Sequence, residues 1–142
     1  RAAPTPVGGP VAVVVEEAPA VNIDVLAGAN GPVSDQVGLI LPTSLCSGQI
    51  ARMIAARLNA EDLGHDKGLS RFVALVHTEG CGVTGADAEE IYTRAMMGYL
   101  THPLVRCAVL LEHGCEKTHN DYFRNKLAAR GLAAAAGSIK AR

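Results

Sequence analysis

Three of the four cysteines occupy equivalent places in a repeating pattern. Cys46, Cys81 and Cys115 each lie between the end of an apolar run and a segment with helical spacing, at intervals of 35 and 34 residues. If the apolar runs are parallel strands, these positions share one edge of the sheet, where open α/β folds bind ligands. Neighbouring strands are about 4.8 Å apart, so the three thiols can reach one small site. Thiolates beside helix N-termini bind soft metals, and the pattern therefore predicts a metal site.

The same cysteines also have a structural interpretation, because free cysteine often packs as a small hydrophobic residue. We expect that role for Cys107, which lies inside an apolar run. No Cys-x-x-Cys pair is present, so neither a zinc ribbon nor a thioredoxin-like motif is indicated. Nothing in the sequence indicates secretion, and we expect all four cysteines to be free thiols in a reducing cytoplasm.

Three glycines flank the predicted thiol site. Gly80, Gly82 and Gly114 permit tight turns or a close approach of the backbone to a cofactor. Glycine is also ordinary in strand-to-helix turns, and the glycines alone favour that simpler interpretation.

Three further residues are candidates for acid–base catalysis. His77 and His113 lie at the ends of apolar runs, where an imidazole can bind a metal or transfer a proton near neutral pH. Glu116 follows Cys115 at the start of a helical segment, where a carboxylate also interacts favourably with the helix dipole. Each histidine taken alone can equally be structural.

Apolar runs alternate with helical patterns along the chain. The apolar runs are Val37–Pro42, Phe72–His77 and Arg106–Glu112, and the helical segments run from Cys46 to Asn59, from Asp87 to about Tyr99 and from Thr118 to Gly131. The alternation predicts an α/β fold with a mostly parallel sheet of successive βα units, three-layered and Rossmann-like. The runs are apolar throughout, as expected when helices cover both faces; alternatively, a segment missing from this chain covers one face. The face predicted to point inward in the first helix consists of Ile50, Met53, Ile54 and Leu58.

The sequence divides into three parts. Residues 1–32 contain five of the seven prolines and read as a linker or β segment, with strand-like runs at Val11–Val15 and Val21–Leu26 and a turn signal at Asn30-Gly31. Residues 33–131 form the predicted α/β domain with its three cysteine-bearing loops. Residues 132–142 are an alanine-rich tail, expected as a short helix or a frayed end.

Composition excludes several classes of protein. The 142 residues, 14.7 kDa in mass, are 49% hydrophobic and 19% charged, which is typical of a globular domain. A net charge of −1 and a pI near 6.6 argue against nucleic-acid or membrane-surface partners. No apolar run is long enough for a membrane helix. The chain starts at Arg1 without a signal sequence, so we expect a fragment or a processed chain.

Ordered motifs around the cysteines resemble a known family. They are Ile40-Leu41-Pro42-Thr43-x-x-Cys46-x-x-x-Ile50-Ala51, His77-Thr78-x-Gly80-Cys81, and His102-Pro103 followed by Gly114-Cys115-Glu116. Together they resemble the altronate and galactarate dehydratases, and also the large subunit of sulfolactate sulfo-lyase. The resemblance covers roughly residues 27–127 and implies the central-domain portion of a longer enzyme, whose N- and C-terminal domains are missing here.

The resemblance implies an iron-dependent hydro-lyase that removes water from a small anionic sugar acid. Cys46, Cys81 and Cys115 would be the shared cysteines, with His77 and Glu116 beside them. Three thiolates suit a ferrous ion or an iron–sulfur cluster. The iron would act as a Lewis acid while a nearby base takes the proton alpha to the carboxylate.

The sequence departs from the family at one pair of residues and leaves other functions open. Asp35-Gln36 stands where the family has Arg-Asn, so the positive charge that could meet an anionic substrate is reversed here. We expect an isolated fragment to keep the fold and lose the activity. The alternatives are a non-catalytic metal- or iron–sulfur-binding α/β domain and an interaction module with inert cysteines. An exposed sheet edge would also allow a homo-oligomer.

Overall fold

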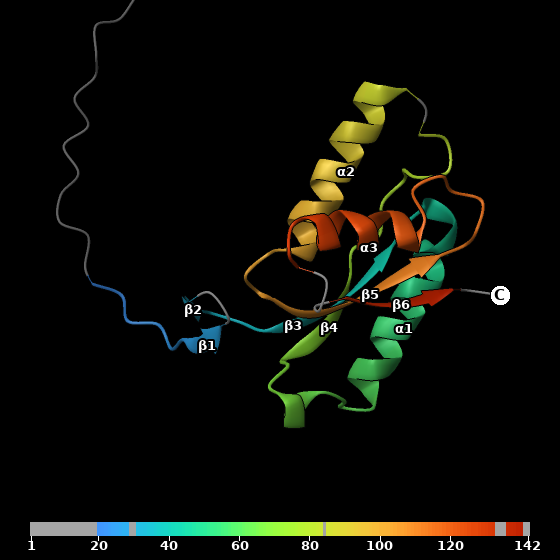
Figure 1. The fold of residues 1–142 in the computed structure, drawn as a ribbon. Coiled ribbons are helices and arrows are strands. Elements are labelled where there is room, and N and C mark those ends of the chain that lie inside the picture. Colours follow the sequence, from blue (N-terminus) through green and yellow to red (C-terminus); the bar gives the residue numbers. More distant parts are fainter. Residues whose placement is uncertain (1–19, 29–30, 84, 133–135, 141–142) are drawn as a thin grey trace, which may run out of the picture.

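The computed structural model describes residues 20–28, 31–83, 85–132 and 136–140, whose strands form two sheets (Figure 1). The larger sheet contains four parallel strands, β3 (Val37–Pro42), β4 (Arg71–Ala74), β5 (Val105–Glu112) and β6 (Ala136–Lys140), in the order β4-β3-β5-β6. The smaller sheet pairs β1 (Leu26–Gly28) with β2 (Gly31–Val33), antiparallel. Gly28 lies opposite Gly31, so Gly31 of the predicted Asn30-Gly31 turn is the first residue of β2; Asn30 is outside the described residues. Val11–Val15 is also outside them, and the run expected from Val21 becomes a strand only at Leu26.

Helices join the successive parallel strands. They are α1 (Gly48–Ala60), α2 (Ala86–Leu100) and α3 (Asn120–Ala129), with short 3-10 turns η1 (Leu45–Ser47) and η2 (His65–Lys67). The predicted α/β class with a mostly parallel sheet is confirmed. None of the described helices combines the length and the hydropathy that a membrane span requires.

The sheet is covered by helices on both faces (Figure 1). Side chains alternate between the faces of a strand, so Leu39 and Leu41 of β3 point one way and Ile40 points the other. Leu39 and Leu41 pack in one apolar cluster with α2 and α3, whose buried contributions include Met96 and Phe123. Ile40 packs in a second cluster with α1. Every residue of β3 is buried, which explains its continuous apolar run.

Strand order places a crevice beside the end of β3. The chain passes from β3 through α1 to β4 on one side, and then through α2 to β5 on the other side of β3. Because α1 follows β3 and α3 follows β5 on opposite faces of the sheet, the loops that leave β3 and β5 diverge at this point. Ligands of open α/β sheets bind at such a switch point, beyond the carboxyl ends of the strands.

Three sequence expectations are wrong in whole or in part. Of the inward face predicted for α1, Ile54 and Leu58 do pack against the sheet, but Ile50 and Met53 are 44% and 58% exposed. The buried positions of this helix include the small residues Ala51 and Ala55, because the helix packs close against the sheet. Cys107 is exposed, not buried, because it lies near the start of β5, where neighbouring Arg106 is exposed as well. Residues 136–140 of the tail form strand β6, whose pairing with β5 outweighs the helix propensity of alanine.

Candidate metal centre

Three loops at the carboxyl edge of the sheet bring three thiols together. They follow β3, β4 and β5 and carry Cys46, Cys81 and Cys115. Sγ of Cys81 lies 3.0 Å from Sγ of Cys46 and 3.4 Å from Sγ of Cys115. His113 belongs to the same group, since a ring nitrogen and the sulfurs of Cys46 and Cys115 all lie within 4.8 Å of one another. The site therefore offers three sulfur ligands and one imidazole.

The loops after β3 and β4 are held against each other by backbone contacts. The amide of Leu45 donates to the carbonyl of Glu79 at 2.9 Å. Gly80 is buried with φ +104°, and a Cβ there would lie 2.4 Å from the carbonyl oxygen of Thr43. Only glycine allows this approach without strain. It fixes the position of Cys81 relative to Cys46.

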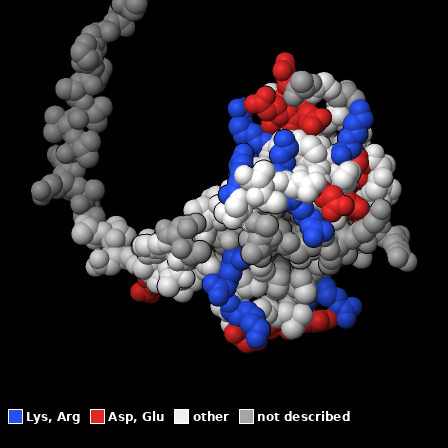
Figure 2. Space-filling view, in the orientation of Figure 1, with Lys and Arg blue, Asp and Glu red and all other residues white. Residues whose placement is uncertain are grey.

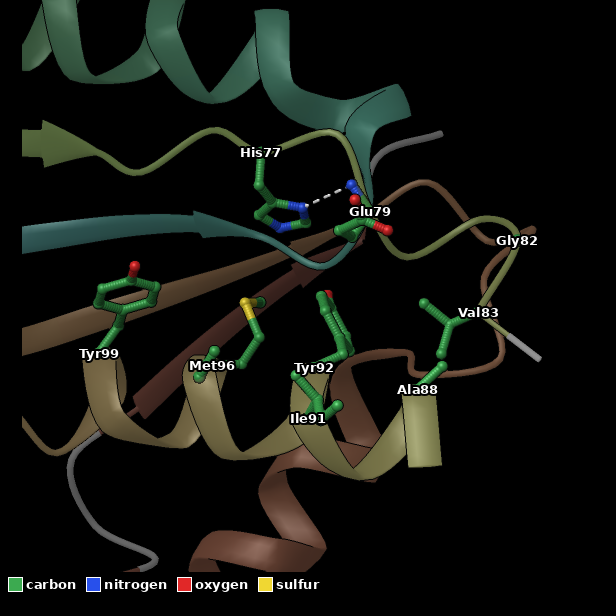
Figure 3. Close-up of a pocket in the computed structure, with 10 residues that line it drawn as sticks. His77, Glu79, Gly82, Val83, Ala88, Ile91, Tyr92, Met96 and Tyr99 are labelled. Carbon is green, nitrogen blue, oxygen red and sulfur yellow. Dashed lines mark hydrogen bonds between the residues drawn. The ribbon is translucent and has the colours of Figure 1, made fainter. Parts of the chain in front are cut away.

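The ring of His77 uses both nitrogens to hold these loops. Nε2 lies 2.7 Å from the carbonyl oxygen of Pro42, to which it must donate, and Nδ1 accepts the amide of Glu79 at 3.2 Å (Figure 3). This pairing requires a neutral imidazole with its proton on Nε2. The edge of the ring also packs on Tyr92, with centroids 5.6 Å apart. The structure thus gives His77 a positioning role beside the thiols, and its predicted part in catalysis stays a prediction.

Glu116 is a buried carboxylate that organises the loop after β5. It accepts hydrogen bonds from Thr43 Oγ1 at 2.6 Å and from the amides of His113 and Gly114 at 2.9 and 2.7 Å. Burial raises the pKa of the carboxyl, but these hydrogen bonds overcome it and lower the pKa to about 2. Such a weak base is poorly suited to take a proton at neutral pH. The predicted catalytic role of Glu116 is therefore the one that this geometry supports least.

Sequence reasoning gave no role to Thr43 and Tyr92, which connect β3 to its neighbours. Thr43 is fully buried, and its hydroxyl binds Glu116 across the switch point. The hydroxyl of Tyr92, on α2, donates to the carbonyl of Thr43 at 2.8 Å. Burial raises the pKa of Tyr92, so the hydroxyl keeps its proton for this bond. Thr43 belongs to the sequence motif around Cys46. Its contact with Glu116 could not be predicted from that motif, because the two residues are 73 positions apart in the sequence.

We expect Tyr92→Phe to lower the free energy of unfolding by about 1 kcal/mol, because the substitution leaves the buried carbonyl of Thr43 without its donor. Urea unfolding followed by circular dichroism measures the change. Tyr99→Phe is the matched control, since Tyr99 lies on the same helix and is 48% exposed. Equal stabilities for the two variants would show that the Tyr92 hydroxyl contributes nothing.

The remaining predicted residues differ in how they contact the site. The ring of His113 is exposed and makes no recorded hydrogen bond in the part of the chain that the structure describes. Gly114 has φ +111°, and its amide is already bound to Glu116. Gly82 is exposed, and a Cβ built there meets nothing within 4 Å. The cofactor-binding role predicted for Gly80, Gly82 and Gly114 stays a prediction.

Hydrogen bonds among the thiols separate their pKa values. The bonds from Cys46 and Cys115 lower the pKa of Cys81, which is the first of the three to ionise. The bond to Cys81 raises the pKa of Cys46, and the same contact together with burial raises the pKa of Cys115 to about 11. Thiolates this close repel one another, so full ionisation of the group requires a bound cation.

Comparison with known families identifies the domain. Residues 37–139 match the family described as D-galactarate dehydratase/altronate hydrolase, second domain. The chain belongs to this family. Comparisons with curated proteins and with solved structures found no match. The resemblance inferred from the cysteine motifs is confirmed, and the matched residues contain all three thiol loops of this galactarate dehydratase/altronate hydrolase second domain.

Asp35 and Gln36, which precede the matched residues, lie at the edge of the sheet opposite the thiols. They precede β3, whereas Cys46 follows it, and a strand of this length spans roughly 20 Å. Asp35 pairs with Arg71 at 2.8 Å and accepts the hydroxyl of Ser70, and the Ser70 bond lowers the pKa of Asp35 more than any other contact. The reversed charge in this pair therefore anchors the start of β4 and does not face the thiol site.

A pocket of about 560 Å³ lies between α2 and the loop after β4 (Figure 3). Ile91, Met96 and Tyr99 of α2 form much of one wall, and His77 and Glu79 lie across from them. The lining is mostly apolar, and its carboxylate would repel an anion. The chemistry of this pocket differs from that of the thiol edge, and it does not fit the sugar acids named in the family description.

Proposed function

We propose that this domain holds an iron centre for a hydro-lyase that removes water from a sugar acid such as galactarate or altronate. The convergence of three thiols and one imidazole at a switch point of the sheet supports the proposal most strongly. The sheet belongs, in this proposal, to a three-layer Rossmann-like domain of a larger enzyme. Free thiols in the site suit a reducing compartment such as the cytoplasm.

The donor set fits iron. Thiolate sulfur and imidazole nitrogen are ligands of ferrous ions and of iron–sulfur clusters, and the proposal covers both. Ser44 is buried two residues before Cys46, and its side chain interacts with the thiols of Cys46 and Cys81 in the direction that lowers their pKa values. A hydroxyl that favours the thiolate form of its neighbours suits a metal site, because metals bind thiolates. Cys46, Cys81 and Cys115 would hold the iron.

The residues around the thiols would have two further roles, which are proton transfer and positioning of the loops. When bound, iron supplies a Lewis acid that polarises the substrate carboxylate or the departing hydroxyl. His113 is exposed beside the thiols, and its imidazole can take the proton from the carbon alpha to the carboxylate. His77 and Glu116 hold the loops in place through their hydrogen bonds to backbone groups. Loss of the alpha proton and the beta hydroxyl then yields the enol of a 2-keto acid and water.

Basic residues are scarce near the thiols, which indicates that other parts of the enzyme help to bind an anionic substrate. The one lysine or arginine among the described residues of the three thiol loops is Lys117, which is exposed. Figure 2 shows acidic and basic side chains close together on the face drawn, not one broad basic surface. A dianionic sugar acid needs more positive charge than Lys117 provides. We propose that other domains of the enzyme supply it.

A second candidate is a metal site without catalysis. The imidazole of His113 lies near the sulfurs of Cys46 and Cys115, and Cys81 contacts the same two sulfurs. If all four groups bind the metal, the four-coordinate site leaves no position for substrate. In that case the centre stabilises the fold, as closed structural sites do. The role of His113 therefore separates the two candidates.

Iron content tests the metal centre directly. The chain is purified without oxygen, reconstituted with Fe²⁺ and sulfide, and assayed for iron and acid-labile sulfide. We expect bound iron in the wild type and in Cys107→Ser, a control that removes an exposed thiol outside the site. The triple variant Cys46→Ser, Cys81→Ser and Cys115→Ser should hold none. Iron with sulfide indicates a cluster, and iron alone a ferrous ion. Failure of the wild type to hold iron would contradict the proposal.

The variant His113→Gln distinguishes catalysis from structure. If His113 transfers the proton, the variant keeps its iron and loses dehydration of galactarate and altronate by about a hundredfold or more. If His113 is the fourth ligand, iron affinity falls instead. The activity assay uses the iron-loaded full-length enzyme, because the isolated domain is expected to be inactive. A full-length wild type that dehydrates neither acid would favour the site without catalysis.

A further inference from the structure

We propose that the thiol site also acts as a redox switch, in which oxidation joins Cys81 to Cys46 in a reversible disulfide. The two sulfurs are already in contact at 3.0 Å, so a disulfide needs a movement of about 1 Å along the line between them. Cys46 is exposed and Cys81 is half-buried, and small oxidants can therefore reach the pair. The proposal follows from the proximity of these two thiols and does not require a metal.

The oxidant in this proposal is a peroxide. One thiol of the pair attacks hydrogen peroxide, its sulfur is oxidised to a sulfenic acid, and the peroxide is reduced with release of water. The other thiol then attacks the sulfenic sulfur, forms the S–S bond and displaces a second water. Two thiols and one peroxide thus give one disulfide and two waters. A dithiol reductant returns both cysteines to thiols.

Cys115 allows a second disulfide to form at the same site. Its sulfur lies 3.4 Å from Cys81, so Cys81 contacts both other thiols and is the shared member of either disulfide. Once Cys46 and Cys81 are joined, Cys115 can attack Cys81 and release Cys46 by thiol–disulfide exchange. Loss of Cys46 should therefore redirect the disulfide to Cys115. Loss of Cys81 removes the thiol that contacts both others and should slow disulfide formation between Cys46 and Cys115, whose sulfurs lie within 4.8 Å of each other.

The consequence for metal binding rests on the proposed function. Either disulfide removes two of the three sulfur ligands, and a disulfide sulfur is a poor ligand compared with a thiolate. Oxidation would therefore release the metal, and a bound metal would protect the thiols. The disulfide-bonded state and the metal-bound state of the site therefore exclude each other.

Disulfide mapping on the chelator-treated, reduced chain tests the proposal. After brief exposure to hydrogen peroxide, mass spectrometry of peptides and titration of free thiols should find a Cys46–Cys81 link in the wild type. Cys46→Ser should give a Cys81–Cys115 link instead. Cys81→Ser should form a Cys46–Cys115 link more slowly than the wild type forms its own link, because Cys81 makes the closest contact with each of these two thiols. Cys107→Ser is the matched control and should match the wild type, because Cys107 lies in β5 away from the three loops. Circular dichroism confirms that each variant folds.

Zinc separates this proposal from the metal centre. Zn²⁺ has no redox chemistry, so it serves as the probe in the same assay. We expect saturation with Zn²⁺ to slow disulfide formation by about tenfold or more, because the thiols are then ligands. If the disulfide forms at equal rates with and without zinc, the result contradicts the proposed metal centre and supports the proposed redox switch. If zinc binds but peroxide links none of the three cysteines in the zinc-free chain, the redox switch is wrong and the metal centre stands.

Discussion

Replacement of Gly80 by alanine is expected to weaken metal binding by about ten- to a hundredfold, although Gly80 offers no ligand atom. The added Cβ would lie 2.4 Å from the carbonyl oxygen of Thr43 and 2.7 Å from Cα of Ser44, both backbone atoms that cannot move aside cheaply. Alanine also disfavours φ +104° by about 1–2 kcal/mol. The loops after β3 and β4 must therefore separate, and with them Cys46 and Cys81.

Competition with a chelator of known affinity measures the effect on Zn²⁺ or Fe²⁺ binding. Gly82→Ala is a close control, because Gly82 lies two residues further along the same loop and an added Cβ meets nothing within 4 Å. We expect Gly82→Ala to bind metal like the wild type. If Gly80→Ala also binds like the wild type, the contact between the two loops does not determine the geometry of the thiols.

The convergence of the thiols could be anticipated from sequence because it depends on topology alone. Once the apolar runs form a parallel sheet, residues at equivalent strand ends must share an edge, whatever their side chains contact. The spacing of Cys46, Cys81 and Cys115 therefore carried real information about the site. The order β4-β3-β5 was not contained in that spacing, yet it decides that β3 lies between the other two strands.

The functions of individual side chains in the loops were harder to anticipate, because their partners are distant in sequence. His77 binds the carbonyl of Pro42, 35 residues away, and Glu116 binds Thr43, 73 residues away. No local pattern reports such contacts. A histidine and a glutamate beside three cysteines suggest catalysis by residue type, whereas their hydrogen bonds to backbone groups are those of positioning residues.

Packing distances explain why the helix faces and the tail were mispredicted. Hydrophobic periodicity favoured the large residues Ile50 and Met53, but α1 approaches the sheet so closely that alanines fill the contact. The tail is rich in alanine, a helix former, yet residues 136–140 pair with β5 as an edge strand. In both places tertiary contacts outweigh local propensity, and a single sequence does not report those contacts.

Glu116→Gln is expected to lower the free energy of unfolding at neutral pH by about 3 kcal/mol and to remove much of its acid dependence. The pKa of Glu116 is about 2 in the folded chain, below the ordinary value of 4.5. A depressed pKa stabilises the fold fully above the unfolded value, and this contribution is lost as the pH falls toward 2. Glutamine keeps one acceptor oxygen, which can serve Thr43 and His113, but its NH2 group replaces the second oxygen and cannot accept from the Gly114 amide.

Urea unfolding at a series of pH values between about 7 and 2 measures this contribution. In the wild type, we expect stability to decline between about pH 5 and pH 2, and the Gln variant should show a shallower decline from a lower starting value. Glu79→Gln is the control, because Glu79 is an exposed glutamate in the neighbouring loop. If the wild type and Glu116→Gln lose stability in parallel as the pH falls, Glu116 is not the carboxylate that couples the fold to acid.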